Sequence, residues 1–330
     1  MEISGNSAGC VWGCAVGDSL GLPYENLAPE RVGKLLGRRR LRHRFVFRYG
    51  MISDDTEHTL IIARCCHQNP GDPDAFEKML SRELRRWLAG FPPGIGLATL
   101  RSLLKLCIGI PPARSGVFSA GNGPAMRSAI IGSLIPDNAE LRRQYIERST
   151  GITHTDPKAF LGSRAVAEIA AKLSNGEWQT KPPIDALMDT LNLISNDPDW
   201  REITSQIAEN LREGKNIEKN SGISGYVYET VPFAITCWYQ NFGNFEQTVM
   251  RSIRGGGDTD STSAICGALA GITGPIPAHF RENLLLWPVK ETDLDLKTFH
   301  RPGLLKMWAR NFIFFIVILA HCLRRCCPPY

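Results

Sequence analysis

The sequence predicts an all-α protein, because helical periodicity runs through most of its 330 residues and no long alternating pattern accompanies it. Apolar residues recur at three- and four-residue steps, which is the spacing of one helix face. The only alternation of apolar and polar residues is short and lies around residues 44–48, so a large sheet is not predicted. No internal repeat of about 20 to 50 residues is visible, which argues against a solenoid. We therefore expect a compact single-domain orthogonal helix bundle.

Six segments carry the helical pattern most clearly. In residues 74–89, Phe76, Leu80 and Leu84 fall on one face, whereas Lys78 falls on the opposite, polar face. The same periodicity predicts helices at 158–174, 184–195, 200–213, 229–241 and 262–272. Short turns of Gly, Pro, Asn and Asp separate these segments, as expected for helices joined by tight connections.

The composition changes near residue 290. We expect a main domain over residues 1–290, followed by a linker and a short hydrophobic C-terminal tail over 291–330. The apolar run 312–320, even when extended by three residues, would span only about 18 Å as a helix, against about 30 Å of membrane hydrocarbon. Two alternatives stay open for this tail: a helix docked on the domain, or membrane contact through residues 304–327.

Composition excludes several classes of protein. With 43% hydrophobic and 22% charged residues, the chain is typical of a soluble globular protein and not of a disordered one. Its ten cysteines include no CxxC spacing and the N-terminus lacks the features of a secretory signal, so a cytoplasmic location is expected. Residues 31–48 carry eight Arg and Lys residues and no acid. No motif of a nucleic-acid-binding module and no interleaved aromatic residues accompany them. They therefore indicate a solvated loop, and no nucleic acid is expected as a partner.

Two acidic clusters stand at predicted helix starts. A plain helix start needs one carboxylate, with Asp54 as the N-cap and Glu57 closing a capping box. Residues 53–57 nevertheless carry a second aspartate, and residues 258–261 carry two more acids and a hydroxyl after three glycines. Four carboxylates with flanking hydroxyls provide the oxygen ligands that Mg²⁺ and Mn²⁺ prefer. The clusters therefore suggest a site for one or two divalent cations.

Three further segments are unusual for a purely structural role. Gly121–Gly123 form a glycine-rich turn before a predicted helix, where exposed amides favour phosphate, although Asn-Gly turns are common. His154 precedes another helix start, where a lone histidine is more often a structural partner than a catalytic group. Glu25 follows a turn rich in helix breakers, where a solvated glutamate is the simplest interpretation.

Together these segments resemble the ADP-ribosylglycohydrolase family, which includes the dinitrogenase-reductase-activating glycohydrolase. The resemblance lies in five ordered segments: GCAVGDSLGLPYE, SDDTEHTL, SAGNGPAMR, THTDP, and the stretch from SGYVYETVPFAI to GGGDTDSTSAICGALAGITGP. They cover about residues 8 to 280 in the family's order, and the paired DDT and GDTD motifs are the most specific part.

The resemblance implies a binuclear site for two Mg²⁺ (or Mn²⁺) ions. Its implied metal ligands are Ser53, Asp54, Asp55, Asp258, Asp260 and Ser261. Asp260 would bridge the ions, Asp55 would orient or deprotonate the attacking water, and Glu25 would carry a proton to the leaving group. The implied substrate-binding residues are Ser119, Gly121, Asn122, Gly123, His154, Gly225 and Tyr226. Serine replaces a frequent threonine at both hydroxyl positions, and Ala120 offers no ring to stack on adenine.

The same resemblance implies a metal-dependent hydrolase that cleaves the glycosidic bond between ADP-ribose and an arginine or serine side chain, or a related ADP-ribosyl conjugate. Its partner would be an ADP-ribosylated protein or a small conjugate, and a monomer is expected. The alternative is a catalytically inactive, ADP-ribose-binding or structural member of the family. The presence of all four aspartates favours the enzyme, because a structural helix start would tolerate asparagine or serine.

Overall fold

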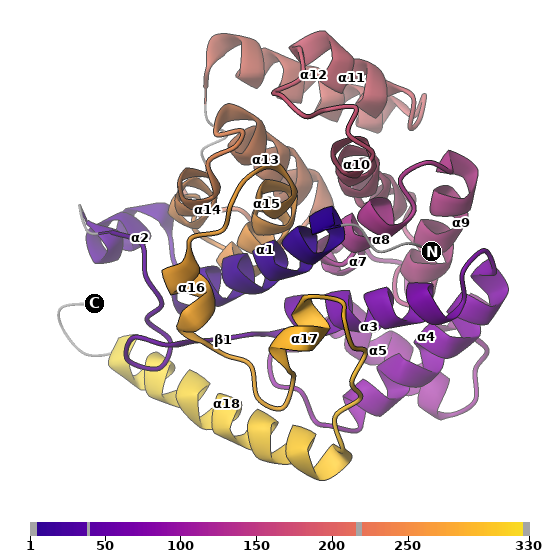
Figure 1. Cartoon of the computed structure of the whole chain (residues 1–330), viewed down its shortest axis with the longest axis vertical. Coiled ribbons are helices and arrows are strands. Elements are labelled where there is room, and N and C mark those ends of the chain that lie inside the picture. The colour runs from indigo at the N-terminus through magenta and orange to yellow at the C-terminus, as the bar shows by residue number, and fades with distance from the viewer. Residues whose placement is uncertain (1–4, 38–39, 216–219, 326–330) are drawn as a thin grey trace.

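The computed structural model of the protein describes residues 5–37, 40–215 and 220–325. The described part is almost entirely helical, which confirms the predicted all-α fold, and all six helices expected from the periodicity are present. Helices α1 and α15 cross the centre of the molecule, and the other helices surround them (Figure 1).

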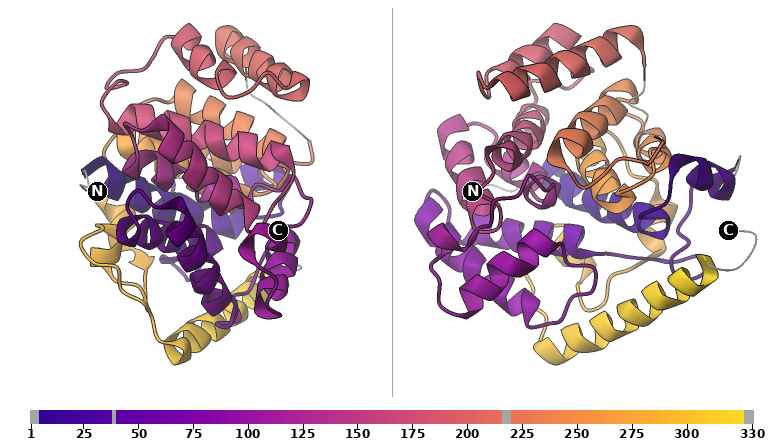
Figure 2. Two further views of the ribbon diagram at one scale, coloured as in Figure 1. Left: turned by 90° about the vertical axis from the view of Figure 1, so that its right-hand side faces the viewer. Right: turned by 180° about the vertical axis from the view of Figure 1, so that it is seen from behind.

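In chain order the elements are α1 (Gly5–Gly21), the short 3₁₀ helix η1 (Leu22–Tyr24), α2 (Pro29–Leu36), β1 (Gly50–Met51), α3 (Asp54–Gln68), α4 (Pro73–Leu88), α5 (Leu97–Cys107), α6 (Pro112–Ser115), α7 (Gly123–Met126), α8 (Ala129–Leu134), α9 (Ala139–Gly151), α10 (Pro157–Ser174), α11 (Ile184–Asn192), α12 (Pro198–Glu213), α13 (Val227–Gln240), α14 (Phe245–Arg254), α15 (Thr259–Thr273), α16 (Ala278–Glu282), β2 (Leu284–Leu285), α17 (Glu291–Leu294) and α18 (Leu304–Arg325). Helices α11 and α12 lie at one end of the molecule and α18 lies at the other (Figures 1 and 2).

A seam of glycines brings α1 and α15 into backbone contact. Glycines recur at every fourth position of α1, on one face of the helix: Gly9, Gly13, Gly17 and Gly21. A Cβ atom added at Gly13 would lie 2.0 Å from the carbonyl oxygen of Gly267, and one added at Gly21 would lie 2.2 Å from that of Thr259. The two helices are therefore antiparallel, and the end of α1 meets the start of α15.

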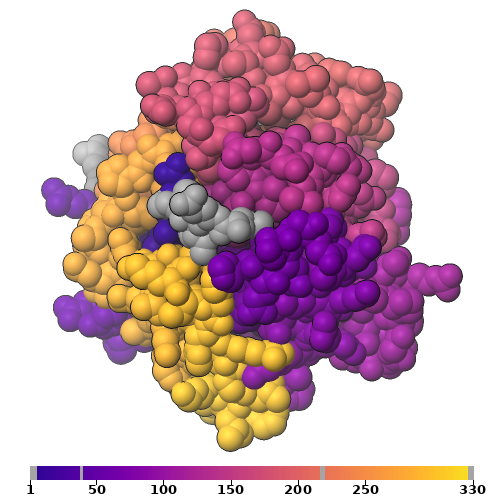
Figure 3. Space-filling model, turned by 45° about the vertical axis from the view of Figure 1, so that its right-hand side comes forward, coloured from indigo at the N-terminus to yellow at the C-terminus, as the bar shows by residue number. Residues whose placement is uncertain are grey.

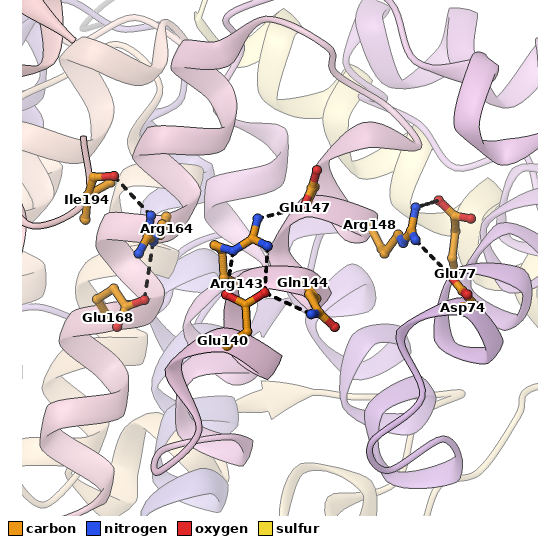
Figure 4. A network of polar contacts seen from close by, with 10 residues as sticks. All are labelled: Asp74, Glu77, Glu140, Arg143, Gln144, Glu147, Arg148, Arg164, Glu168 and Ile194. Carbon is orange, nitrogen blue, oxygen red and sulfur yellow. Dashed lines mark hydrogen bonds and ion pairs between the residues drawn. The ribbon is translucent and has the colours of Figure 1, made fainter. Parts of the chain in front are cut away.

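Ion pairs tie the outer helices together. Arg148 of α9 contacts Asp74 of α4 at 2.8 Å, and Arg164 lies 3.6 Å from Glu168 within α10 (Figure 4). Glu168 also pairs with the buried Arg142 of α9, so it links α9 to α10. This layer supports the central helices and lies apart from the site described below.

The only strand pairing between named strands is small: β1 and β2 form a two-stranded parallel sheet over the residues that the structure describes. The alternating pattern around residues 44–48 gives only an isolated bridge between Val46 and Tyr49. Two residues per strand cannot build a sheet face, so the short alternation agrees with an all-α fold.

The predicted C-terminal tail is a single 22-residue helix, α18. It packs against the domain through a face that includes Arg310, Asn311 and Phe314, which are buried. The helix is long and apolar enough to cross a membrane, and most of it is exposed. Residues 326 and 327, the end of the predicted membrane-contact segment, lie outside the described residues.

Some residues beyond the predicted boundary at 290 belong to the core. Leu294 and Leu296 are buried, and the indole nitrogen of Trp12 donates a 2.8 Å hydrogen bond to Asp295. The division of the chain at residue 290 stays a prediction.

Candidate functional site

A cleft of about 450 Å³ opens where α1 ends and where α3 and α15 begin. The predicted residues that line it are Glu25, Asp54, Asn122, Gly123, Gly225, Asp258, Asp260 and Ser261. They come from segments far apart in the chain, and the antiparallel glycine seam brings two of these segments together, the one after α1 and the one that begins α15.

The start of α3 differs from the predicted capping box. Ser53 is the N-cap residue, and its hydroxyl accepts a 3.3 Å hydrogen bond from the amide of Asp55. Glu57 accepts a 2.6 Å bond from the indole nitrogen of Trp87, so it does not close the box. The prediction of Asp54 as N-cap was wrong because Ser53 already has the extended backbone and the oxygen that this position needs. The Asp54 side chain is thereby left facing the cleft.

Asp18, in the last turn of α1, holds the same helix start in place. One of its carboxylate oxygens accepts hydrogen bonds from the amide of Ser53 at 2.8 Å and from the amide of Thr56 at 3.3 Å. The Thr56 hydroxyl donates to the same oxygen. Sequence reasoning gave Asp18 no role, although a buried aspartate in an apolar helix requires such partners.

The starts of α3 and α15 meet at Asp55. Its Oδ2 atom accepts a 3.1 Å hydrogen bond from the hydroxyl of Ser53 and a 3.4 Å bond from that of Ser261. The other carboxylate oxygen, Oδ1, is buried and has no hydrogen-bond partner within the described residues, and the same holds for Oδ1 of Asp260. Buried carboxylate oxygens without a donor are costly unless something else compensates them.

The acids of the site repel one another and are poorly hydrated. Burial, together with the charge of Asp18, raises the pKa of Asp54 to about 8. Burial also raises the pKa of Asp55 well above its ordinary value, with Asp18 and Asp54 adding to the effect. The pKa of Asp260 is raised for the same reason, with Glu25 as its strongest charged neighbour. Without a cation, these groups favour their protonated forms.

The donor set fits a divalent cation, although its present arrangement does not enclose one. Among the described residues, no three His, Cys, Asp or Glu side chains are grouped closely enough to hold a metal ion. The unpartnered oxygens of Asp55 and Asp260 and the hydroxyls of Ser53 and Ser261 are nevertheless all oxygen donors, the kind that Mg²⁺ and Mn²⁺ select.

Glu25 is held beside Asp258 by its neighbour in the chain. The amide of Asn26 donates a 2.7 Å hydrogen bond to the carbonyl of Gly257, and the side-chain amide of Asn26 donates at 3.0 Å to Glu25. Glu25 is half-buried, and burial followed by the charge of Asp258 raises its pKa. A glutamate with a raised pKa holds its proton more readily, which suits a general acid.

The glycine-rich turn of residues 121–123 contributes to the site mainly through the side chain of Asn122, and less through its backbone amides. The Asn122 side chain donates to Asp258 at 2.7 Å and to the hydroxyl of Thr230 at 3.0 Å. Its backbone amide donates to the carbonyl of Gly225 at 2.9 Å, and that of Gly121 to the hydroxyl of Ser119 at 3.3 Å. Two amides of the predicted phosphate cradle are thus already engaged.

His154 lies beneath this turn and does not line the cleft. A Cβ atom added at Gly121 would approach its Nε2 atom to 3.0 Å, and the ring accepts or donates a 2.9 Å bond with Thr153. Burial, followed by the charge of Arg127, lowers the pKa of His154 to about 3, so the ring is neutral. Tyr226 likewise lies outside the cleft lining, where its hydroxyl is 3.4 Å from the ammonium of Lys158.

Sequence reasoning also missed Arg127. This fully buried guanidinium contacts His58 at 3.1 Å, the carbonyl of Ser149 at 2.9 Å and the hydroxyl of Thr153 at 2.8 Å. The charge of Asp54 acts to raise its pKa, although burial lowers it to about 10 overall. A buried cation close to the acidic cluster offsets part of the repulsion there.

Comparison with known proteins finds similarity along most of the chain. A sequence profile described as ADP-ribosylglycohydrolase matches residues 3–301. An uncharacterized protein of Archaeoglobus fulgidus is 30% identical over 291 residues, which cover 83% of this chain and 90% of the relative. The ADP-ribosyl-[dinitrogen reductase] glycohydrolase of Rhodospirillum rubrum is 22% identical, over 82% of this chain and 86% of its own. A solved structure titled as an ADP-ribosylglycohydrolase-related protein complex has the same fold, with a TM-score of 0.67 at 22% identity, covering 93% of this chain and 98% of its own.

Proposed function

Because the chain belongs to the ADP-ribosylglycohydrolase family, whose members hydrolyse ADP-ribosyl conjugates, we propose that it releases ADP-ribose from a modified arginine or serine side chain or from a related conjugate. One observation carries the proposal: Glu25 and the acids of two separate helix starts converge on one cleft. A structural helix start needs a single capping group, so this concentration of acids calls for a chemical role.

The candidate ligands of two Mg²⁺ or Mn²⁺ ions are Ser53, Asp54, Asp55, Asp258, Asp260 and Ser261. When bound, the ions would supply positive charge to grip ribose hydroxyls and polarise a water molecule. Asn122 keeps the Asp258 carboxylate oriented through its 2.7 Å hydrogen bond. Asp18 fixes the start of α3 and so the direction of Asp54 and Asp55.

The chain's own acids would move the protons. We assign Asp55 to orient or deprotonate the attacking water, because its Oδ1 atom is unpartnered within the described residues. We assign Glu25 to protonate the departing group, since it lines the cleft and burial raises its pKa, which favours its protonated form. An oxocarbenium-like transition state carries positive charge, and the carboxylates around it would stabilise that charge.

Release of free ADP-ribose tests the proposal. Arginine-linked and serine-linked ADP-ribosyl peptides are incubated with the protein, with Mg²⁺, with Mn²⁺ and with excess chelator. We expect the protein to hydrolyse at least one of the two peptides. Excess chelator should abolish this turnover, and the Asp260→Asn variant should show none although it remains folded. Tight binding of ADP-ribose with no turnover of either peptide would instead favour a binding protein of the same family, and undiminished turnover in chelator would contradict the metal-dependent mechanism.

For location, we propose a cytoplasmic monomer whose α18 contacts a membrane surface. Exposed apolar residues on the outer face of α18 include Ile313, Ile316 and Leu323, and a helix with such a face suits the membrane interface. The loop beside this helix adds Phe47, which is 94% exposed and is followed by Arg48. Co-sedimentation with anionic and neutral vesicles tests this contact: we expect binding to anionic vesicles, weakened by salt, and no binding to either kind would contradict it.

A further inference from the structure

A groove of about 710 Å³ continues from the candidate active site toward the C-terminal helix. It shares Glu25, Asn26 and Gly94 with the catalytic cleft, so the two spaces adjoin at the proposed acid. The volume lies within the range of about 300–1,000 Å³ that is typical of small-molecule sites. We infer that this groove receives the leaving group of the substrate, and that it favours a leaving group that carries an aromatic ring.

Helix α18 forms one wall of the groove. Trp308, Phe312 and Phe315 line it, and the last two are 67% and 47% exposed. The matched family region ends at residue 301, so this wall is built by residues that follow it. In the space-filling view the yellow C-terminal residues lie directly against the violet segment that includes α4 (Figure 3).

A second part of the groove lining is a strained loop that α18 holds in place. Phe91 has a positive φ of 54° and is 75% exposed, an unusual conformation for a bulky residue that leaves its ring in the groove. The indole nitrogen of Trp308 donates a 2.7 Å hydrogen bond to the carbonyl of Ala89, and the side chain of Asn311 donates one of 2.7 Å to that of Gly90. These bonds fix the loop against α18, where the ring of Phe91 lies 6.3 Å from that of Trp308.

The same helix is anchored to the active site itself. The guanidinium of Arg310 donates to the carbonyl of Ile52, which directly precedes the metal-site helix start, and pairs with Glu57 at 3.3 Å. At the other end of α18, the Arg325 side chain donates a 3.0 Å bond to the carbonyl of Pro23, two residues before Glu25. The groove wall is thus positioned by contacts to the segments that carry Asp54 and Glu25.

The residues that line the cleft and the groove indicate which part of the substrate each one holds. Asn122 and Gly225, on the predicted diphosphate and nucleoside side of the cleft, do not line the groove, whereas Glu25 lines both spaces. A group that leaves the ribose beside Glu25 therefore extends into the groove. The exposed aromatic rings of Phe91 and Phe312 offer stacking and edge contacts to an aromatic ring in the groove.

This inference rests on the proposed hydrolase function. Two conjugates allow the groove assignment to be tested separately from that function. ADP-ribosyl conjugates of phenethyl alcohol and of ethanol have the same glycosidic linkage and differ only in the ring. We expect kcat/KM to be about tenfold higher for the phenethyl conjugate. Phe312→Ala and Phe91→Ala should each reduce this ratio to about twofold or less while leaving the ethyl conjugate's kcat/KM within about twofold of wild type. Ile316→Ala, on α18 but outside the groove lining, is the matched control and should keep the ratio.

Equilibrium binding of both conjugates in chelator gives a second measurement that needs no turnover. Tighter binding of the phenethyl conjugate, lost in Phe312→Ala and kept in Ile316→Ala, would support the groove even if neither conjugate is hydrolysed, in which case only the proposed function fails. Turnover of both conjugates at equal kcat/KM would overturn the groove assignment and leave the hydrolase standing. Equal effects of Phe312→Ala and Ile316→Ala on the ratio would also overturn it, because the groove would then not be the cause.

Discussion

Substituting Gly13 by alanine tests whether backbone contact between α1 and α15 sets the position of the site. The new Cβ atom would lie 2.0 Å from the carbonyl oxygen of Gly267 and 2.7 Å from its carbonyl carbon. Because both contacts are with backbone, no flexible side chain can move aside, and the two helices must separate by about 1 Å. Gly33 in α2 gives a matched control, since a Cβ atom there meets nothing within 4 Å.

The expected free-energy change combines two terms. Overpacking costs about 3 kcal/mol, at the upper end of its usual range, and the better helix propensity of alanine returns about 1 kcal/mol. The net loss of about 2 kcal/mol, divided by an unfolding entropy of about 2.1 cal/mol/K per residue, lowers Tm by about 3 °C. Gly33→Ala should instead raise the free energy of unfolding by up to about 1 kcal/mol.

Urea denaturation followed by circular dichroism measures both free energies, and a thermal scan gives Tm. Opposite signs for Gly13→Ala and Gly33→Ala are the predicted result. A Gly13→Ala protein as stable as wild type would refute the reasoning, because the two backbones would then have room for a side chain between them.

Three further predictions concern the acids and the nucleotide. In chelator, the pKa of the Asp54 carboxyl is raised from an unfolded value of about 4 to about 8, so it contributes stability that is present below pH 4 and lost as the pH rises toward 8. Mg²⁺ or Mn²⁺ should remove most of this loss of stability. A series of Tm measurements from pH 4 to 8, with and without metal, tests this, and parallel curves would contradict it. Asp18→Ala should lower the free energy of unfolding, measured by urea denaturation, by about 2–4 kcal/mol, because the buried amides of Ser53 and Thr56 lose their hydrogen-bond acceptor. A loss below about 1 kcal/mol would mean that water replaces the carboxylate. ADP-ribose at a hundredfold excess over its Kd should stabilise the metal-loaded protein by about 2.7 kcal/mol, and equal stabilisation by AMP at the same concentration would mean that the distal ribose is not held at the metal site.

The helices were predictable from the sequence because each carries its own apolar stripe. The segment that became α4 shows Phe76, Leu80 and Leu84 on one face, and the structure buries all three. For α18, the sequence showed the apolar run and the segment 304–327 that contains the helix, but not which polar residues dock it on the domain. Arg310 and Asn311 interrupt the apolar character of the segment, and they are residues that bind the domain.

The site was only partly predictable, because some of its residues act through long-range contacts. The acids of residues 53–55 and 258–260 stood out by their number and their positions at helix starts. Asp18 and Arg127 lie inside quoted motifs, but their partners are distant in the sequence, and only the fold brings them together. The four-residue spacing of glycines in α1 was a visible signal for close helix packing, and it would have placed Glu25 beside the start of α15.

The number of Mn²⁺ ions bound per chain tests the central claim most directly, because it depends on the carboxylates alone and on no choice of substrate. Calorimetric titration of the full chain at pH 7.5 should give two ions per wild-type chain. Asp260→Asn should lose at least one of the two, since Asp260 is proposed to bridge them, while the control Gly33→Ala retains both. A wild-type chain that binds no Mn²⁺, or an Asp260→Asn chain that still binds two with unchanged affinity, would contradict the binuclear site.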